Sequence, residues 1–363
     1  MQEALRQARK GVGRTSPNPA VGAVVVRDGS IAASGFHRKA GLPHAEVEAL
    51  NRLGRATGRD ILYVTLEPCN HQGRTPPCTE AILKSGIRRV VVGMKDPNPD
   101  VSGGGCRRLR KEGIEVVTGV LEPQCRRLNE AFITYVTRKR PFVALKSALT
   151  LDGWTATSTG HSKWITNERS RHFVHRLRDR YDAVMVGIGT ALTDDPMLTT
   201  RLKRGRGRDP VRIVVDTRLR IPPDAAMLSH GSSAETVLVV GDRVPASKRN
   251  AFERPGVSLV TCGAGAGKID LPGLMNILGQ RQITSLLVEG GAAIAGSLIR
   301  DRLVDKFYVF MAPKLLGGGD GVPMASGPGA LKMDGCVDLR DMRLRRFGED
   351  ILIEGYPRYP DET

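Results

Sequence analysis

The chain has 363 residues, of which 40% are hydrophobic and 26% charged, and its formal net charge at pH 7 is +17. The length suits two domains of ordinary size, and the composition excludes a disordered chain. No apolar run is long enough to span a membrane, and the polar start, MQEALRQARKG, lacks the apolar segment of a signal peptide. The six cysteines are too sparse for a disulfide framework, so we expect a cytoplasmic protein.

The basic charge is spread along the chain in short clusters, such as Arg107–Arg108 and Arg138–Arg140. A basic balance suits nucleic acids, but it also suits small phosphorylated substrates. Aromatic residues make up 4% of the chain and do not alternate with a basic stripe, which argues against a single-strand nucleic-acid binder. We therefore expect arginines that bind phosphate groups, with neither nucleic acid nor membrane as a partner.

The first part of the chain alternates predicted strands and helices. A polar helix at the start precedes a buried strand at 21–26, a hairpin turn at Arg27–Gly29 and a second strand at 31–35. The following elements are then predicted in chain order: helix 45–53, strand 61–66, helix 79–85, strand 89–93, helix 105–112 and strand 114–118. This alternation is typical of an α/β layer fold.

A charged segment at 136–141 reads as a linker, so we expect domains at 1–140 and 141–363. The second domain is predicted to be a larger α/β unit, with its clearest helices at 167–179 and 292–300. Its predicted strands are 142–148, 183–187, 211–215, 236–240, 257–260, 285–289, 305–311 and 351–354.

Two glycine-rich segments of the second domain fail as nucleotide-binding motifs. Gly187–Thr190 contains one G-x-G but lacks a third glycine at the required spacing. Gly263–Lys268 imitates a phosphate-binding loop, but Cys262 stands where the first glycine belongs and Ile269 replaces the Ser or Thr. The residue pattern alone therefore leaves the function of the second domain open.

The most informative motif is His44-Ala45-Glu46, followed by Pro68-Cys69 and by Cys78. One imidazole and two thiolates form the ligand set of a catalytic zinc site with one open position. Zinc lowers the pKa of a bound water toward neutrality, and Glu46, which is not a ligand, can shuttle the proton. This is the chemistry of zinc-dependent deamination, so the first domain is predicted to remove ammonia from a heterocycle.

The predicted elements place the ligands at helix starts. His44 lies at the start of helix 45–53, and Cys78 begins the next helix, where the helix dipole favours a thiolate. A closed structural zinc site would need a fourth protein ligand, and an ordinary buried Cys or His would not need the adjoining Glu46. Eight residues separate Cys69 from Cys78, whereas deaminases of nucleic acids and nucleosides commonly show a tight C-x-x-C.

Ten motifs in chain order resemble those of a known family. They are Asn18–Gly22, His44–Glu46, Thr65–Cys69, Thr75–Cys78, Asp96–Pro99, Ser147–Gly153, Ser162–Thr166, Val186–Thr190, Asp194–Pro196 and Val288–Gly291. Over nearly its whole length the chain resembles the bifunctional deaminase–reductases of riboflavin biosynthesis. This resemblance implies a cytidine-deaminase-like α/β/α domain followed by a dihydrofolate-reductase-like α/β domain.

For the first domain, the resemblance implies that zinc hydroxide deaminates 2,5-diamino-6-(5-phosphoribosylamino)pyrimidin-4-one to 5-amino-6-(5-phosphoribosylamino)uracil. It implies that Asn18 hydrogen-bonds the heterocycle. It also implies that the ribose-phosphate side is lined by His37, Arg74, Asp96 and Asn98. Without the resemblance, Asn18 and Asp96–Asn98 would read as ordinary turn residues.

For the second domain, the resemblance implies that NADPH reduces the ribosyl group to a ribityl chain after the sugar ring opens. It implies catalytic roles for Lys146, Asp194 and Glu289. The implied substrate contacts are Ser162, Arg178, Leu198, Arg201 and Glu289, with Arg178 and Arg201 on the phosphate. The implied cofactor contacts are Thr157, Trp164, Thr166, Gly187, Gly189, Thr190, Asp194, Asp216, Gly290 and Gly291. From pattern alone, the glycines could equally form tight turns, and Trp164 could be either a core aromatic or part of the cofactor wall.

Two other functions stay open at this point. A nucleic-acid-editing deaminase with an accessory domain is disfavoured by the long Cys69–Cys78 loop and the scarce aromatic residues. A non-catalytic zinc scaffold is disfavoured by the intact Glu46. We expect an enzyme that uses one zinc ion per deaminase site and NADPH, and that acts on a small phosphorylated pyrimidine. We also expect a homo-oligomer, either a dimer or a tetramer.

Overall fold

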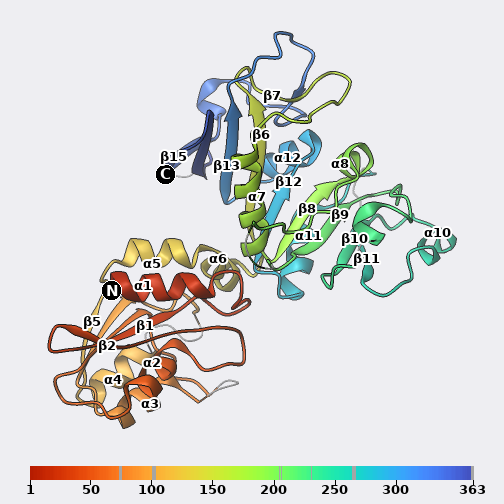
Figure 1. The fold of residues 1–363 in the computed structure, drawn as a ribbon. Helices are drawn as coiled ribbons and strands as arrows, with labels where there is room; N and C mark the ends of the chain where they lie inside the picture. The colour runs from red at the N-terminus through yellow and green to blue at the C-terminus, as the bar shows by residue number, and fades with distance from the viewer. Residues whose placement is uncertain are drawn as a thin grey trace. The chain divides into compact units, whose positions relative to one another are not determined.

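The computed structural model describes residues 1–72, 76–99, 104–203, 205, 207–229, 231–263 and 267–360 (Figure 1). The chain divides into two compact units, Met1–Arg140 and Pro141–Thr363, and each unit has its own sheet and core. Within the described ranges, no helix has both the length and the apolar character needed to cross a membrane.

The first unit is built on a five-stranded sheet with the order β2-β1-β3-β4-β5. Strand β1 pairs antiparallel with β2 and β3, whereas β3, β4 and β5 are parallel, so the predicted hairpin is confirmed. The strands are β1 (Gly22–Arg27), β2 (Ser30–Phe36), β3 (Ile61–Leu66), β4 (Arg89–Met94) and β5 (Glu115–Thr118). Apolar side chains such as Val64 and Val92 are fully buried in this unit, because helices cover both faces of the sheet (Figure 1).

Six helices and a short 3₁₀ turn at Arg9–Gly11 complete the part of the first unit that the structure describes. The helices are α1 (Gln2–Ala8), α2 (Ala45–Leu53), α3 (Cys78–Ser85), α4 (Gly104–Lys111), α5 (Glu122–Leu128) and α6 (Glu130–Arg138). The predicted linker at 136–141 was partly wrong, since α6 continues to Arg138. The buried Val136 and the apolar residues one turn before it favour a helix despite the flanking charges.

The second unit is built on a nine-stranded sheet with the order β11-β10-β9-β8-β12-β6-β13-β16-β15. The first seven strands in this order are parallel, and β16 pairs antiparallel with both β13 and β15. The parallel strands are β6 (Phe142–Thr150), β8 (Ala183–Gly187), β9 (Val211–Val215), β10 (Thr236–Val240), β11 (Val257–Thr261), β12 (Ser285–Glu289) and β13 (Lys306–Ala312). The antiparallel edge consists of β15 (Asp338–Phe347) and β16 (Asp350–Arg358). A two-stranded ribbon is formed by β7 (Trp154–Ala156) and β14 (Val322–Pro323).

Helices cover both faces of the parallel strands. They are α7 (Glu168–Arg180), α8 (Ile188–Asp194), α9 (Ala226–Ser229), α10 (Ala246–Asn250), α11 (Leu271–Gln280) and α12 (Ala292–Arg300), with a 3₁₀ turn at Met333–Gly335. Met185 of β8 packs in the core formed with α11 and α12, whereas its neighbours Val184 and Val186 pack in the core formed with α8 and α9. Burial on both faces explains why these strands read as continuous apolar runs in the sequence.

The antiparallel edge was the part of the second sheet that the sequence predicted least well. The predicted strand 351–354 covers only part of β16, and β15 was missed. None of the residues of β15 is buried, so its sequence, DLRDMRLRRF, lacks the alternation of apolar and polar residues that marks a half-buried strand.

Candidate active sites

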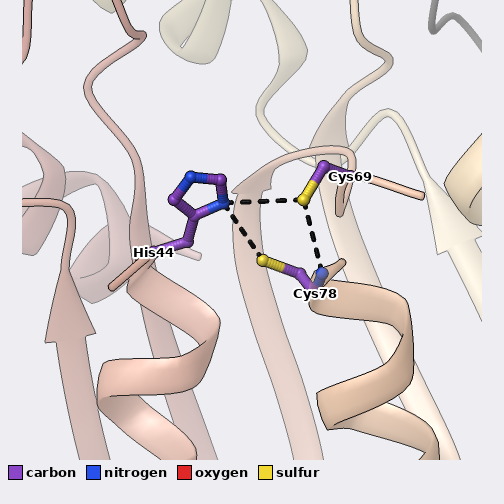
Figure 2. Close-up of side chains that lie close together, drawn as sticks. All are labelled: His44, Cys69 and Cys78. Atoms are coloured by element: carbon purple, nitrogen blue, oxygen red, sulfur yellow. Dashed lines mark hydrogen bonds between the residues drawn. The ribbon is translucent and has the colours of Figure 1, made fainter. Parts of the chain in front are cut away.

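Three predicted ligands of the first unit meet at the ends of their elements. His44 is the N-cap of α2, Cys78 is the first residue of α3, and Cys69 lies in the loop that follows β3. Their ligand atoms all lie within 4.8 Å of one another, and Figure 2 shows the imidazole and the two thiol groups converging. The ends of two helices and one strand therefore hold the ligand set that the sequence predicted.

The contacts within this cluster match a metal-binding set. His44 Nδ1 lies 3.2 Å from Cys78 Sγ and 3.5 Å from Cys69 Sγ, and the Cys78 backbone N–H donates to Cys69 Sγ at 3.3 Å (Figure 2). Hydrogen bonds from Cys78 and His44 lower the pKa of Cys69 to about 4, against the opposing effect of burial. One imidazole and two cysteines fit a zinc ion, and a three-residue set leaves one position for water or substrate.

Glu46 lies in the first turn of α2, close to the ligands, and is 3% exposed. Burial, followed by the nearby Cys69 charge, raises the pKa of Glu46 to about 7. A carboxyl group that titrates near neutrality can both accept and return a proton.

His37 and Asn18 lie beside His44. The rings of His37 and His44 meet edge to face with centroids 5.0 Å apart. Asn18 Nδ2 lies 3.1 Å from His37 Nε2, and His37 Nδ1 lies 3.2 Å from the Pro43 carbonyl oxygen. Burial lowers the pKa of His37, so this ring is neutral near pH 7, donating from Nδ1 and accepting at Nε2. The two residues thus form a hydrogen-bonded wall next to the zinc ligands.

Asp96 and Asn98 lie in the loop after β4, the strand next to β3 in the sheet. Asp96 Oδ1 accepts a hydrogen bond from the Asn98 backbone N–H at 2.9 Å, which is the turn chemistry that pattern alone indicates. Burial raises the pKa of Asp96, and the charges of Glu67 and Cys69 act on the same carboxyl group. Asp96 therefore lies within electrostatic range of the zinc site. The predicted phosphate contact Arg74 lies outside the described residues.

A cavity of about 1110 Å³ lies in the second unit, at the carboxyl ends of β6, β8, β9 and β12. Ligands of open α/β sheets characteristically bind at this edge. Most of the residues predicted for this site line the cavity: Lys146, Ser162, Trp164, Thr166, Arg178, Gly187, Gly189, Thr190, Asp194, Leu198, Arg201, Glu289, Gly290 and Gly291.

A buried ion pair lies in the wall of this cavity. Arg178 Nε and Nη2 donate to the two carboxylate oxygens of Glu289 at 2.6 and 2.9 Å, and Nη1 donates to the Thr199 carbonyl oxygen. Burial acts to raise the pKa of Glu289, but the Arg178 charge and hydrogen bonds outweigh it and lower this pKa. Glu289 is paired with Lys146 in the register of β12 and β6. Burial lowers the pKa of Lys146, while the Glu289 charge acts in the opposite direction.

Trp164 and the glycine pair Gly290–Gly291 fit a binding role rather than a core role. Trp164 is 61% exposed, and the Arg171 guanidinium lies 4.4 Å from its ring centroid, so the core-aromatic interpretation was wrong. Gly290 and Gly291 have φ angles of 114° and 79°, in the region that disfavours side chains. Both glycines line the cavity, so the backbone between β12 and α12 forms part of its wall.

Two predicted cofactor contacts do not line the cavity. Thr157 closes a local turn, in which its hydroxyl oxygen accepts from the His161 backbone N–H. Asp216 is fully buried, and its Oδ2 accepts from the backbone N–H groups of Arg220 and Ile221. Its Oδ2 thus shapes the loop after β9.

Three residues that line the cavity were not predicted from the sequence: Thr217, Arg220 and Lys268. The chain offered little signal for them, because exposed basic residues are frequent throughout a sequence of net charge +17. Only the fold brings the loop after β9 and the segment before α11 to the same cavity.

Replacing a ligand cysteine should remove the metal. Cys78→Ala deletes one of three zinc ligands. The zinc content of the purified variant should therefore fall well below that of the unchanged protein when it is measured by elemental mass spectrometry. Cys125→Ala changes a buried cysteine of the same unit that lies outside the cluster and should retain the metal. Equal zinc contents in the two variants would contradict the ligand set.

Comparisons with known proteins match both units. Residues 1–94 match the cytidine and deoxycytidylate deaminase zinc-binding region, and residues 141–353 match the RibD C-terminal domain. The riboflavin biosynthesis protein RibD of Aquifex aeolicus is 43% identical over 353 residues, which cover 97% of this chain and 96% of that protein.

Solved structures extend the likeness to the whole fold. The diaminohydroxyphosphoribosylaminopyrimidine deaminase/5-amino-6-(5-phosphoribosylamino)uracil reductase of Thermotoga maritima matches with a TM-score of 0.86 and 38% identity, covering 99% of this chain and 97% of that chain. The RibD structure from Acinetobacter baumannii matches with a TM-score of 0.88 and 35% identity, covering 98% and 97%. The predicted family and fold class are confirmed, and the chain belongs to the RibD family of bifunctional deaminase–reductases of riboflavin biosynthesis.

Proposed function

We propose that the unit at 1–140 deaminates 2,5-diamino-6-(5-phosphoribosylamino)pyrimidin-4-one and that the unit at 141–363 reduces the ribosyl group of the product. The observation that carries this proposal is the cluster of His44, Cys69 and Cys78 beside the buried Glu46. A second support is the cavity in the second unit, which Lys146 of β6 lines. Both reactions concern one phosphoribosyl group, which accounts for the basic character of the chain.

In the first reaction, the chain holds the metal, orients the ring and moves a proton. A zinc ion held by His44, Cys69 and Cys78 supplies the Lewis acidity that makes a water molecule acidic near neutral pH. Glu46, which is buried beside the ligands, would accept a proton from water and return it to the departing amine. Asn18 orients the heterocycle through its amide, whose nitrogen is held by His37.

In the second reaction, the chain orients an opened sugar and supplies a proton. NADPH provides the hydride for the electrophilic C1 of the sugar. Lys146, whose pKa is lowered by burial, gives a proton to the oxygen or nitrogen that gains electron density. Asp194 binds sugar hydroxyl groups, and Arg201 binds the phosphate. Arg178 already uses three of its five N–H donors on Glu289 and Thr199, so we assign it mainly to holding Glu289.

The loop after β9 is suited to the 2′-phosphate that distinguishes NADPH from NADH. An acidic residue that accepts from the ribose hydroxyl group is typical of NAD sites, and an arginine is typical of NADP sites. Here the Asp216 carboxylate is buried against backbone N–H groups, while Thr217, Arg220 and Lys268 face the cavity. We assign the 2′-phosphate to these three residues.

We also propose a homo-oligomer, dimer or tetramer, in the cytoplasm. Among the described residues, no strand pairs with the outer side of β15, and Met342 and Leu344 on this strand are 60% and 68% exposed. Such an edge favours pairing with a second copy. All six cysteines are free, which suits a reducing compartment.

Glu46→Gln should separate metal binding from deamination. The amide cannot carry the proton between water and amine, so ammonia release should fall by about 100-fold or more while the zinc content stays unchanged. Reduction of the deaminated substrate by NADPH should continue at the normal rate. Normal ammonia release from zinc-loaded Glu46→Gln would disprove the proton-transfer role.

Lys146→Ala should give the reciprocal result. Loss of the amine should lower the rate of NADPH oxidation by about 100-fold or more, while ammonia release continues. The rate is followed as the loss of NADPH absorbance at a fixed concentration of the uracil substrate. Loss of both activities in a folded Lys146→Ala protein would contradict two independent sites.

Arg220→Ala should weaken the preference for NADPH. Removing the guanidinium should raise the KM for NADPH by about tenfold and leave the KM for NADH nearly unchanged, because only NADPH carries the 2′-phosphate. Arg218→Ala removes an exposed arginine two residues earlier that does not line the cavity and is the matched control. Equal changes for both cofactors would argue against the assigned phosphate contact.

A further inference from the structure

Glu67 is a buried carboxylate that neither the zinc set nor the proposed substrate contacts use. It lies between the end of β3 and Cys69 and is 4% exposed. Its Oε1 accepts from the Cys106 backbone N–H at 2.8 Å, and its Oε2 accepts from the Asp96 backbone N–H at 3.1 Å. Its own backbone N–H donates to the Met94 carbonyl oxygen at 2.9 Å. One side chain therefore links three segments: the loop after β3 that carries Cys69, here called the cysteine loop, the loop after β4 and the first turn of α4.

The first turn of α4 also presses directly on the cysteine loop. A Cβ atom at Gly105 would lie 1.8 Å from the Pro68 carbonyl oxygen, which no real contact allows. Pro68 immediately precedes the ligand Cys69, so the absence of a side chain at Gly105 sets how closely α4 approaches that ligand. A Cβ atom at the neighbouring Gly104 would meet no atom of the described residues within 4 Å.

The opposite side of the cysteine loop is held by the start of α3. The Thr79 backbone N–H donates to the Cys69 carbonyl oxygen at 3.2 Å, and Thr79 Oγ1 donates to Asn70 Oδ1 at 2.9 Å. The loop that carries Cys69 is thus fixed between the starts of two helices, and Glu67 is the connection to the α4 side.

We propose that Glu67 is a positioning residue of the deaminase, which sets the Asp96 loop relative to the zinc ligand Cys69. The inference rests on the proposed deaminase function and on the assigned substrate contact of Asp96. Two backbone N–H groups point at two carboxylate oxygens, an arrangement that needs an acceptor at each position. An amide offers one acceptor, and its NH₂ group would face the second backbone N–H.

The first test is Glu67→Gln in the full chain. Loss of one charge-assisted hydrogen bond should raise the KM of the deaminase for its pyrimidine by about tenfold, with a smaller change in kcat and an unchanged zinc content. The zinc content reports the amount of folded first unit, and the reductase activity of the same chain, which belongs to the second unit, should not change. If Glu67 had a purely structural role, Glu67→Gln would lower the stability of the first unit and leave the KM of the folded fraction unchanged.

The second test is the matched pair Gly105→Ala and Gly104→Ala. Gly105→Ala must displace Pro68 and should weaken zinc binding by about tenfold in competition with a chelator, whereas Gly104→Ala should bind zinc normally. Equal zinc affinity in the two variants, or an unchanged KM in Glu67→Gln, would overturn the positioning role. A wild-type chain that binds zinc but releases no ammonia would overturn the proposed function itself.

Discussion

Both sites depend on one constraint, which is that parallel strands end at the same edge of a sheet. In the first unit, β3 leads to Cys69 and β4 leads to Asp96, while the starts of α2 and α3 supply the other zinc ligands. In the second unit, β12 ends at Glu289 and β6 carries the adjacent Lys146. Helix starts at such an edge also offer backbone N–H groups and a favourable dipole for thiolates and phosphates. The two chemistries therefore use the same architectural position in unrelated sheets.

Three buried glutamates show how the surroundings set the role of one residue type. A buried carboxylate must be compensated, or its proton is retained. Glu289 is compensated by the bidentate Arg178, which lowers its pKa, and so it holds negative charge in the reductase cavity. Glu67 accepts hydrogen bonds from two backbone N–H groups and so links the segments that carry Asp96 and Cys106. Burial of Glu46 raises its pKa to about 7, and this glutamate is the one suited to carry protons.

The sequence predicted well those features in which one residue pattern determines a structure. Buried strands such as β3 and β8 were recognised as apolar runs, and the zinc ligands were recognised because one His, two Cys and an adjoining Glu match a catalytic zinc set. It failed where the decisive contact is distant in the chain or carries no pattern. The exposed β15 gives no alternation, and Asp216 turned out to hold its own loop. The interaction of Glu67 with Cys106 joins residues that are 39 positions apart.

The central claim is that one chain carries out deamination and then reduction at two sites. The most direct measurement follows ammonia release and NADPH absorbance together, with purified protein and the phosphoribosylamino diaminopyrimidinone, in the presence and absence of a zinc chelator. Ammonia should appear before NADPH is consumed, and the chelator should stop ammonia release from the starting substrate while added deaminated substrate is still reduced. Failure of a folded, zinc-loaded chain to release ammonia, or NADPH consumption without prior ammonia release, would contradict the central claim.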